Sequence, residues 1–381
     1  MLFRSATVQA FTVEEVFVGR LRERAAALRT TNLGIARLRA LVFPVLAVAG
    51  GASVALLIGL GGREVAAGRL TAGTLVAFVG LLAYLLVPLR LLGFLLPVFQ
   101  RTEASLERVY VVLDAVPERP ELGRSVEIPR ALRGPTIELD GLRFAYPDAP
   151  DRPVLEGIRA RIEGGTTVGV FGRTGAGKTT LLKILARSWN AADGAVRVDG
   201  VPLSQVDLDE WRRRLAYVPQ TPFLFSESIA ENVGLGQQGA VIENAVRAAA
   251  LAPDLAALPE GLATVVGERG IVLSGGQRQR VALARGLARP ADLVLLDDVL
   301  SAVDHRTEVE LLDTLAAPRA DGRVPTRVIV SNRLSALERA DQVLVLDAGR
   351  LVDVGTHSEL IERPGPYRDA WVAQRDPAEG A

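Results

Sequence analysis

The chain has 381 residues, no cysteine and a formal net charge of zero, with 44 basic and 44 acidic residues. The lack of cysteine excludes disulfide bridges and thiolate metal sites, and the charge balance argues against a nucleic-acid partner bound through bulk electrostatics. The length suffices for one complete α/β domain together with a smaller membrane portion.

Two long uncharged stretches dominate the first part of the chain. Residues 40–62 and residues 70–89 contain no charged side chain, and each is close to the roughly 20 apolar residues that span a bilayer. We predict two transmembrane helices, at about 40–62 and 70–96, within a membrane portion over residues 1–118. Two buried core helices of a soluble protein are disfavoured, because apolar runs of this length exceed typical globular helices.

A proline-containing segment, residues 119–135, follows the membrane portion and is predicted to be a stiff linker. The last residues, 371–381, are predicted to be a tail that ends in a frayed polar segment.

A phosphate-loop pattern follows an apolar run at residues 167–171 that we predict to be a buried strand. The glycines of such a loop let successive N–H groups face phosphates, and the helix that starts near Lys178 adds the positive end of its dipole. We expect Lys178 to contact the β- and γ-phosphates of ATP and Thr179 to bind Mg²⁺. A plain glycine-rich turn is disfavoured by the preceding strand and the Lys-Thr pair. The predicted nucleotide-binding residues of the loop are Gly172, Arg173, Thr174, Gly175, Ala176, Gly177, Lys178, Thr179 and Thr180.

A second apolar run, residues 293–296, ends in two adjacent carboxylates, Asp297 and Asp298. Open α/β sheets bind ligands at the carboxyl ends of their parallel strands. Asp297 is therefore predicted to hold Mg²⁺, and Asp298 is predicted to orient the attacking water. The alternative, two acids that serve only solubility, is disfavoured after a phosphate loop.

The segment Leu273-Ser274-Gly275-Gly276-Gln277 lies between the phosphate loop and the paired aspartates. Together these motifs resemble those of ABC transporter ATPases, and the resemblance covers residues 136–370. It implies a P-loop NTPase fold with an antiparallel β subdomain and an α-helical subdomain. It also implies that Ser274, Gly275, Gly276 and Gln277 complete the nucleotide cage of an opposite subunit.

Further positions match the same family. The resemblance implies that Tyr146 stacks on adenine, although an isolated tyrosine in such a strand more often serves packing. It implies that Gln220 contacts Mg²⁺ and water and passes the nucleotide state to the membrane part. The segment 267–270 resembles one that contacts the membrane domain in that family, and Asp304 matches a position in the family's loop that crosses the dimer interface.

The membrane portion also resembles this family, in its exporter-type members with fused membrane and ATP-binding domains. Residues 8–15 look like the cytoplasmic extension between the fourth and fifth membrane helices. From this resemblance we expect the chain to be an N-terminally truncated half-transporter that lacks the first four helices, with transport belonging to the parental protein. The resemblance implies a multi-pass protein of the bacterial inner membrane with a cytoplasmic ATP-binding domain. Its transported substrate cannot be read from two helices.

Two positions depart from the family pattern. Where the family generally has Glu and His, this chain has Asp298 and Asn332. Asp298 keeps the charge but is one methylene shorter, which draws its carboxylate back by about 1 Å, and such a misplacement costs on the order of a hundredfold in rate. Asn332 can hydrogen-bond a phosphate oxygen but cannot carry a proton. His305 and His357 do not replace it by position, and we interpret both as surface or structural residues.

These departures predict a site that binds ATP well and hydrolyses it slowly. Our interpretation is the degenerate-site half of a heterodimeric exporter, whose partner is a second half-transporter in the same bilayer. A homodimer with two slow sites and a non-hydrolysing ATP-sensing subunit are the alternatives. A soluble ABC-type ATPase is disfavoured by the two predicted spans.

Overall fold

The chain divides into two compact units, Met1–Pro117 and Glu118–Ala381. The computed structural model describes residues 5–115, 126–192, 194–267, 273–302, 305–318 and 321–375. The predicted linker, 119–135, therefore lies partly outside the described residues, as do residues 268–270, Asp304 and most of the polar end of the tail.

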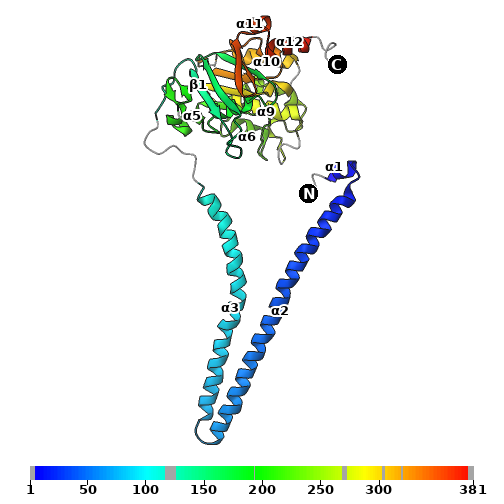
Figure 1. The fold of residues 1–381 in the computed structure, drawn as a ribbon, viewed down its shortest axis with the longest axis vertical. Coiled ribbons are helices and arrows are strands. Elements are labelled where there is room, and N and C mark those ends of the chain that lie inside the picture. Colours follow the sequence, from blue (N-terminus) through cyan, green and yellow to red (C-terminus); the bar gives the residue numbers. More distant parts are fainter. Residues whose placement is uncertain are drawn as a thin grey trace. The chain divides into compact units, whose positions relative to one another are not determined.

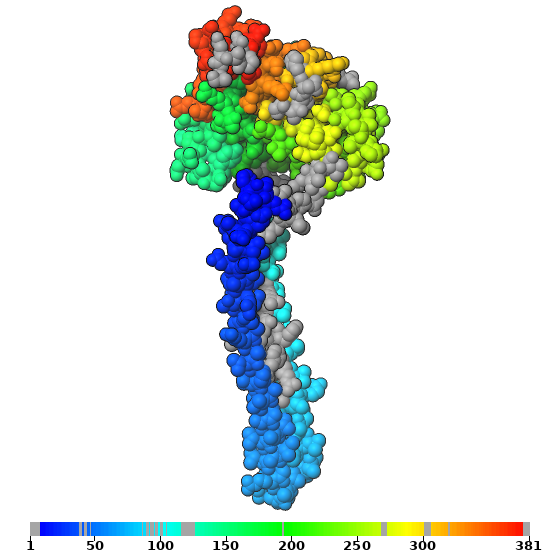
Figure 2. All heavy atoms as spheres, turned by 90° about the vertical axis from the view of Figure 1, so that its right-hand side faces the viewer, coloured from blue at the N-terminus to red at the C-terminus, as the bar shows by residue number. Residues whose placement is uncertain are grey.

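The first unit is a helical hairpin (Figure 1). It consists of α1 (Ser5–Ala10), α2 (Glu14–Ala66) and α3 (Ala72–Leu113). Near the turn, α2 and α3 pack so closely that a Cβ on Gly61 would lie 2.4 Å from Cδ1 of Leu75. The Thr71 side chain caps α3 by accepting the N–H of Thr74 at 3.2 Å. Figure 2 shows the side chains of α2 along the length of this hairpin.

One stretch of the described residues, Ala47–Ala66, is a helix long and apolar enough to cross a membrane. It overlaps the first predicted span but begins and ends later, and residues 42, 43 and 46 are among those whose side chains are not described. A shorter apolar stretch, Ala72–Leu85, opens α3. Several side chains between 86 and 97 are not described, so the second span, 70–96, stays a prediction.

The second unit is built on a six-stranded sheet with the order β10-β9-β3-β8-β7-β6. All neighbouring pairs are parallel except β9 and β10. The parallel strands therefore end at one common edge, where open α/β sheets bind their ligands. The strands are β3 (Thr167–Gly172), β6 (Leu215–Val218), β7 (Leu293–Asp297), β8 (Thr326–Val330), β9 (Gln342–Asp347) and β10 (Arg350–Gly355).

A second, four-stranded antiparallel sheet has the order β2-β1-β4-β5. Its strands are β1 (Ile137–Phe144), β2 (Leu155–Ile162), β4 (Val196–Val198) and β5 (Val201–Pro202). The helices around the sheets are α4 (Lys178–Leu185), α5 (Leu208–Arg213), α6 (Ile229–Gly234), α7 (Ala240–Ala248), α8 (Ala252–Ala256), α9 (Gly275–Leu287), α10 (His305–Ala316), α11 (His357–Glu362) and α12 (Pro366–Arg375). Short 3₁₀ turns are η2 (Leu203–Gln205), η3 (Gly261–Ala263), η5 (Val299–Ala302) and η6 (Leu334–Leu337).

The large sheet is buried on both faces. Along β7 every residue is buried, and alternate residues belong to two different apolar clusters, Leu293 and Leu295 to one and Val294 and Leu296 to the other. This alternation follows from the period of two in a strand. Helix α4 packs in the first cluster and α9 in the second. The predicted α/β fold with an antiparallel β subdomain and helical subdomain is confirmed.

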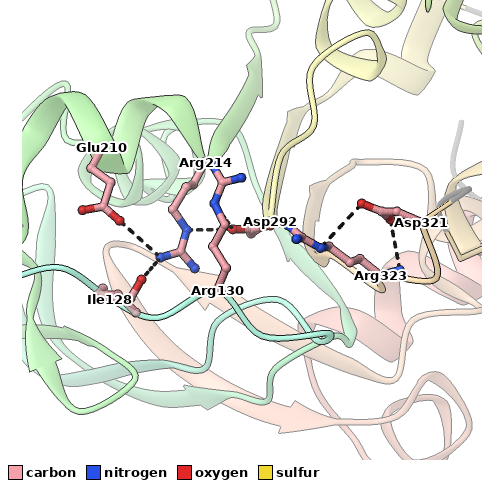
Figure 3. Close-up of polar contacts among 7 residues, drawn as sticks. All are labelled: Ile128, Arg130, Glu210, Arg214, Asp292, Asp321 and Arg323. Carbon is pink, nitrogen blue, oxygen red and sulfur yellow. Dashed lines mark hydrogen bonds and ion pairs between the residues drawn. The ribbon is translucent and has the colours of Figure 1, made fainter.

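The edge of the large sheet opposite the strand carboxyl ends is held by a buried ion cluster (Figure 3). Nε of Arg214, just before β6, donates to Oδ2 of Asp292, just before β7, at 2.7 Å, and these side chains are only 4% and 6% exposed. Arg130 and Arg323 face the same carboxylate at 3.9 and 3.7 Å. Arg214 also donates to the carbonyl oxygen of Ile128. The cluster fastens the segment before β1 to the sheet.

Candidate nucleotide-binding site

The predicted phosphate loop connects β3 to α4. Gly177, which precedes α4, has φ +95°, and a Cβ there would lie 2.6 Å from Leu155, so both backbone conformation and space require glycine. Nζ of Lys178 donates to the carbonyl oxygens of Gly172 and, at 3.1 Å, Arg173. Burial lowers the pKa of Lys178, and the charges of the neighbouring aspartates oppose that shift. The ammonium group is therefore held over the loop and beside two carboxylates.

The residues predicted to bind Mg²⁺ meet at the end of β7. Oγ1 of Thr179, in the first turn of α4, donates to Oδ1 of Asp297 at 3.1 Å. Asp297 is 1% exposed, and burial raises its pKa. The hydroxyl of Tyr217 makes a longer contact, 3.5 Å, with the other carboxylate oxygen. Hydroxyl and carboxylate oxygens, with room for waters, are the donors that Mg²⁺ takes in phosphate sites, so this donor set fits the ion.

Asp298 lies directly after β7 in a left-handed conformation, with φ +51°. Its backbone N–H donates to the carbonyl oxygen of Val330 at 3.0 Å, and Nε2 of Gln220 donates to its Oδ2 at 3.2 Å. Burial raises the pKa of Asp298, while a hydrogen bond from the backbone of Asn332 lowers it. These contacts fix the carboxylate between the ends of β6, β7 and β8.

One cavity of about 190 Å³ gathers most of the predicted catalytic and phosphate-binding residues. Gly172 and Arg173 belong to the same loop but do not line it. Val154 and Gly175 also line a neighbouring cavity of about 820 Å³, so the two spaces adjoin. The predicted residues that line the smaller cavity are Thr174, Gly175, Ala176, Gly177, Lys178, Thr179, Thr180, Gln220, Asp297, Asp298 and Asn332.

Tyr146 lines the larger cavity together with Trp189. The Tyr146 ring meets Phe144 and Trp189 nearly at right angles, at centroid distances of 5.1 and 5.3 Å. Its hydroxyl lies 3.0 Å from Oγ1 of Thr180. The ring therefore packs against aromatic neighbours and also borders open space. Sequence reasoning missed Trp189, because it follows α4 in a segment without a motif.

The signature segment opens α9. Ser274 caps the helix by accepting the N–H of Gln277 at 3.2 Å, and Oε1 of Gln277 accepts the N–H of Ser274 at 2.9 Å, which completes a capping box. None of Ser274, Gly275, Gly276 and Gln277 lines either cavity. Asp254, which sequence reasoning missed, accepts from Arg280 through two hydrogen bonds and from Gln277.

His357 lines neither of these cavities. Nδ1 of His357 lies 2.8 Å from the hydroxyl of Tyr367, and burial lowers the pKa of His357. His305 begins α10, but its side chain is not described.

Comparison with known proteins agrees with this arrangement. The family model described as ABC transporter matches residues 155–301. A solved bacterial Atm1-family ABC exporter with ATP bound superposes with a TM-score of 0.86 at 31% identity, over 98% of this chain and 65% of that chain. This chain has the fold of an ABC exporter. The phosphate loop, the paired aspartates and the start of the signature helix all lie within the matched residues.

Curated relatives of this ABC exporter fold match nearly the whole chain. The multidrug resistance-like ATP-binding protein MdlA of Escherichia coli is 38% identical over 90% of this chain and 58% of its own length. The probable multidrug resistance ABC transporter ATP-binding/permease protein YheI of Bacillus subtilis is 36% identical over 97% of this chain and 62% of its own length. An ATP-dependent lipid A-core flippase of Bordetella avium is 38% identical over 93% and 58%. The chain thus spans about 60% of the length of these relatives.

Proposed function

We propose that the chain is part of an ATP-binding and permease subunit of an ABC exporter, which couples ATP binding and hydrolysis to movement of a substrate across the bacterial inner membrane. The observation that carries this is the single cavity at the strand ends, where Lys178, Thr179, Asp297 and Asp298 meet beside Gln220. The apolar stretch Ala47–Ala66 supports contact with a bilayer. Relatives named for multidrug resistance and as a lipid A-core flippase support transport across a membrane.

The polar side chains that line the two cavities have separate roles in this proposal. Lys178 and the loop N–H groups hold the phosphates, and Tyr146 contacts the adenine in the larger cavity. Thr179 and Asp297 hold Mg²⁺, which when bound offsets the charge of the β- and γ-phosphates. Gln220, already hydrogen-bonded to Asp298 at 3.2 Å, orients the attacking water together with that carboxylate.

The signature segment acts on a second subunit. Ser274 and Gly275 are exposed and lie outside the cavities of their own chain. The helix they open has 13 residues, and its N-terminus favours an anionic ligand. A partner's nucleotide supplies that ligand when two subunits close. ATP drives closure only because it contacts Lys178 and the opposite signature together in the closed state.

We further propose that this chain's own site hydrolyses ATP slowly. The side chain of Asp298 is one methylene shorter than that of glutamate, and its carboxylate accepts from Gln220 and from the backbone of Asn332. Its backbone N–H also donates to Val330 at the end of β8. Asn332 lines the cavity where an imidazole would otherwise lie. Loss of well-placed general-base help removes on the order of a hundred- to ten-thousandfold in rate. The proposed partner is a half-transporter with Glu and His at these positions.

Single-turnover hydrolysis of radiolabelled ATP tests this assignment. The chain and its Asp298→Glu/Asn332→His variant are compared at saturating Mg²⁺ and at concentrations that favour dimers. A slow parent with a variant faster by about a hundredfold or more supports the weakened site. Equal rates would show that Asp298 is sufficient to activate the attacking water, and a homodimeric exporter would then be the better interpretation than a heterodimer. No turnover in either, with ATP bound, favours the ATP-sensing subunit.

A further inference from the structure

The helix α12 contacts the strand β3 and the turn that follows β8, both of which lead into the nucleotide cavity. Near its start, Tyr367 is 2% exposed and packs edge to face on Phe171, with centroids 5.2 Å apart. Phe171 is the residue before Gly172, the first residue of the phosphate loop. One end of α12 is therefore fixed against the end of β3.

Near its other end, α12 reaches the turn that follows β8. Oε1 of Gln374 accepts the backbone N–H of Leu334 at 3.1 Å, and Nε2 of Gln374 donates to the backbone carbonyl oxygen of Asn332 at 2.8 Å. One amide group thus spans the turn with a donor and an acceptor. The backbone of Asn332 also hydrogen-bonds to Asp298, so it is held by Gln374 on one side and by Asp298 on the other.

We propose that Gln374 is a positioning residue for Asn332, through which α12 sets the geometry of the γ-phosphate side of the cavity. This rests on the proposed function, in which Asn332 occupies the position where the family generally has His and lines the cavity that holds the phosphates. Gln374 is exposed, so its truncation opens no cavity in the core. A side chain kept only for packing would not place both of its polar atoms on one turn.

The test uses the full chain in detergent, in the Asp298→Glu/Asn332→His background as well as the parent. Gln374→Ala is compared with Val372→Ala, which alters a side chain on the same helix that is 54% exposed. We expect Gln374→Ala to lower the single-turnover rate by about 10- to 100-fold, the range that a misplacement of up to 1 Å causes. ATP affinity stays within about twofold, because the phosphate loop is untouched.

A second readout does not depend on turnover. Hydrogen exchange of the Leu334 amide should be faster in Gln374→Ala, because its acceptor is removed, and unchanged in Val372→Ala. Gln374→Glu keeps the acceptor for the Leu334 N–H but loses the donor to Asn332. Exchange of the Leu334 amide should therefore stay slow, whereas the single-turnover rate should recover only in part relative to Gln374→Ala.

The outcomes separate this inference from the function it rests on. A rate within twofold of the background for Gln374→Ala, or an equal loss for Val372→Ala, would overturn the positioning role. If the background variant is itself no faster than the parent, the weakened-site proposal fails. In that case the hydrogen-exchange rate of the Leu334 amide is the remaining test. An unchanged exchange rate in Gln374→Ala overturns the role of Gln374.

Discussion

Substituting Asp292 by alanine should destabilise the second unit strongly. The change removes the carboxylate that Arg214 contacts at 2.7 Å and leaves it the longer contact with Glu210, at 3.8 Å, while Arg214 is only 4% exposed. Leaving a buried charge without its partner costs about 3–5 kcal/mol. A domain of this size shifts its Tm by about 2–4 °C per kcal/mol, so we expect a loss of roughly 6–20 °C.

Tryptophan fluorescence reports this transition within the full chain. The protein has three tryptophans, at positions 189, 211 and 371, and all lie in the second unit. Trp211 is 1% exposed, and its indole N–H donates to the carbonyl oxygen of Leu185 at 2.9 Å. Thermal unfolding followed at this signal therefore measures the second unit without a contribution from the helical hairpin.

Asp321→Ala is the matched control. Asp321 faces Arg323 of the same cluster at 3.5 Å, but its side chain is 53% exposed, and exposed pairs contribute about 0–1 kcal/mol. Replacing Arg214 by methionine in the Asp292→Ala protein removes the buried charge that has lost its close partner and should recover much of the loss. A Tm shift for Asp292→Ala no larger than that for Asp321→Ala would refute the reasoning.

Three further predictions follow from the site and its surroundings. Lys178→Ala should abolish nucleotide binding at this chain's own site, measured by equilibrium binding of labelled ATP, and unchanged affinity would contradict the phosphate-loop assignment. Gly177→Ala should weaken ATP binding and cost about 1–2 kcal/mol of stability in chemical denaturation, because φ is +95° and Leu155 lies 2.6 Å from the added Cβ; parental values for both would show that the loop tolerates a side chain. Burial lowers the pKa of His357, so the unfolded chain binds the proton more tightly. The Tm should therefore fall as the pH drops from above to below about 6.5, the ordinary pKa of histidine. In His357→Gln the Tm should change less with pH over this range. An equal change in both proteins would show that other groups cause the pH dependence.

Motifs carried by short segments could be predicted from the sequence. The strand before Gly172, the loop up to Thr179 and the strand that ends in Asp297 are each specified by neighbouring residues, because glycine freedom and an apolar run act locally. The fold class followed from their order. The prediction was less complete where local signals were weak. The charged segment before the first predicted span and that span form one continuous helix, α2, of 53 residues.

Contacts between distant residues could not be predicted in this way. Arg214 and Asp292 lie 78 positions apart, and Gln374 and Asn332 lie 42 apart. No local pattern specifies such pairs, since they depend on the order of strands in the sheet and on where α12 returns to it. The left-handed conformation of Asp298 likewise arises where β7 meets the turn after β8.

The nucleotide site of this chain is proposed to bind ATP firmly and to hydrolyse it slowly. The most direct measurement is the identity of the nucleotide that stays on the parent chain after incubation with saturating Mg²⁺ and ATP, rapid removal of free nucleotide and acid quenching. The proposal predicts bound nucleotide that is almost entirely ATP after minutes, whereas the Asp298→Glu/Asn332→His variant holds mainly ADP. Mainly ADP on the parent chain, or no retained nucleotide, would contradict it.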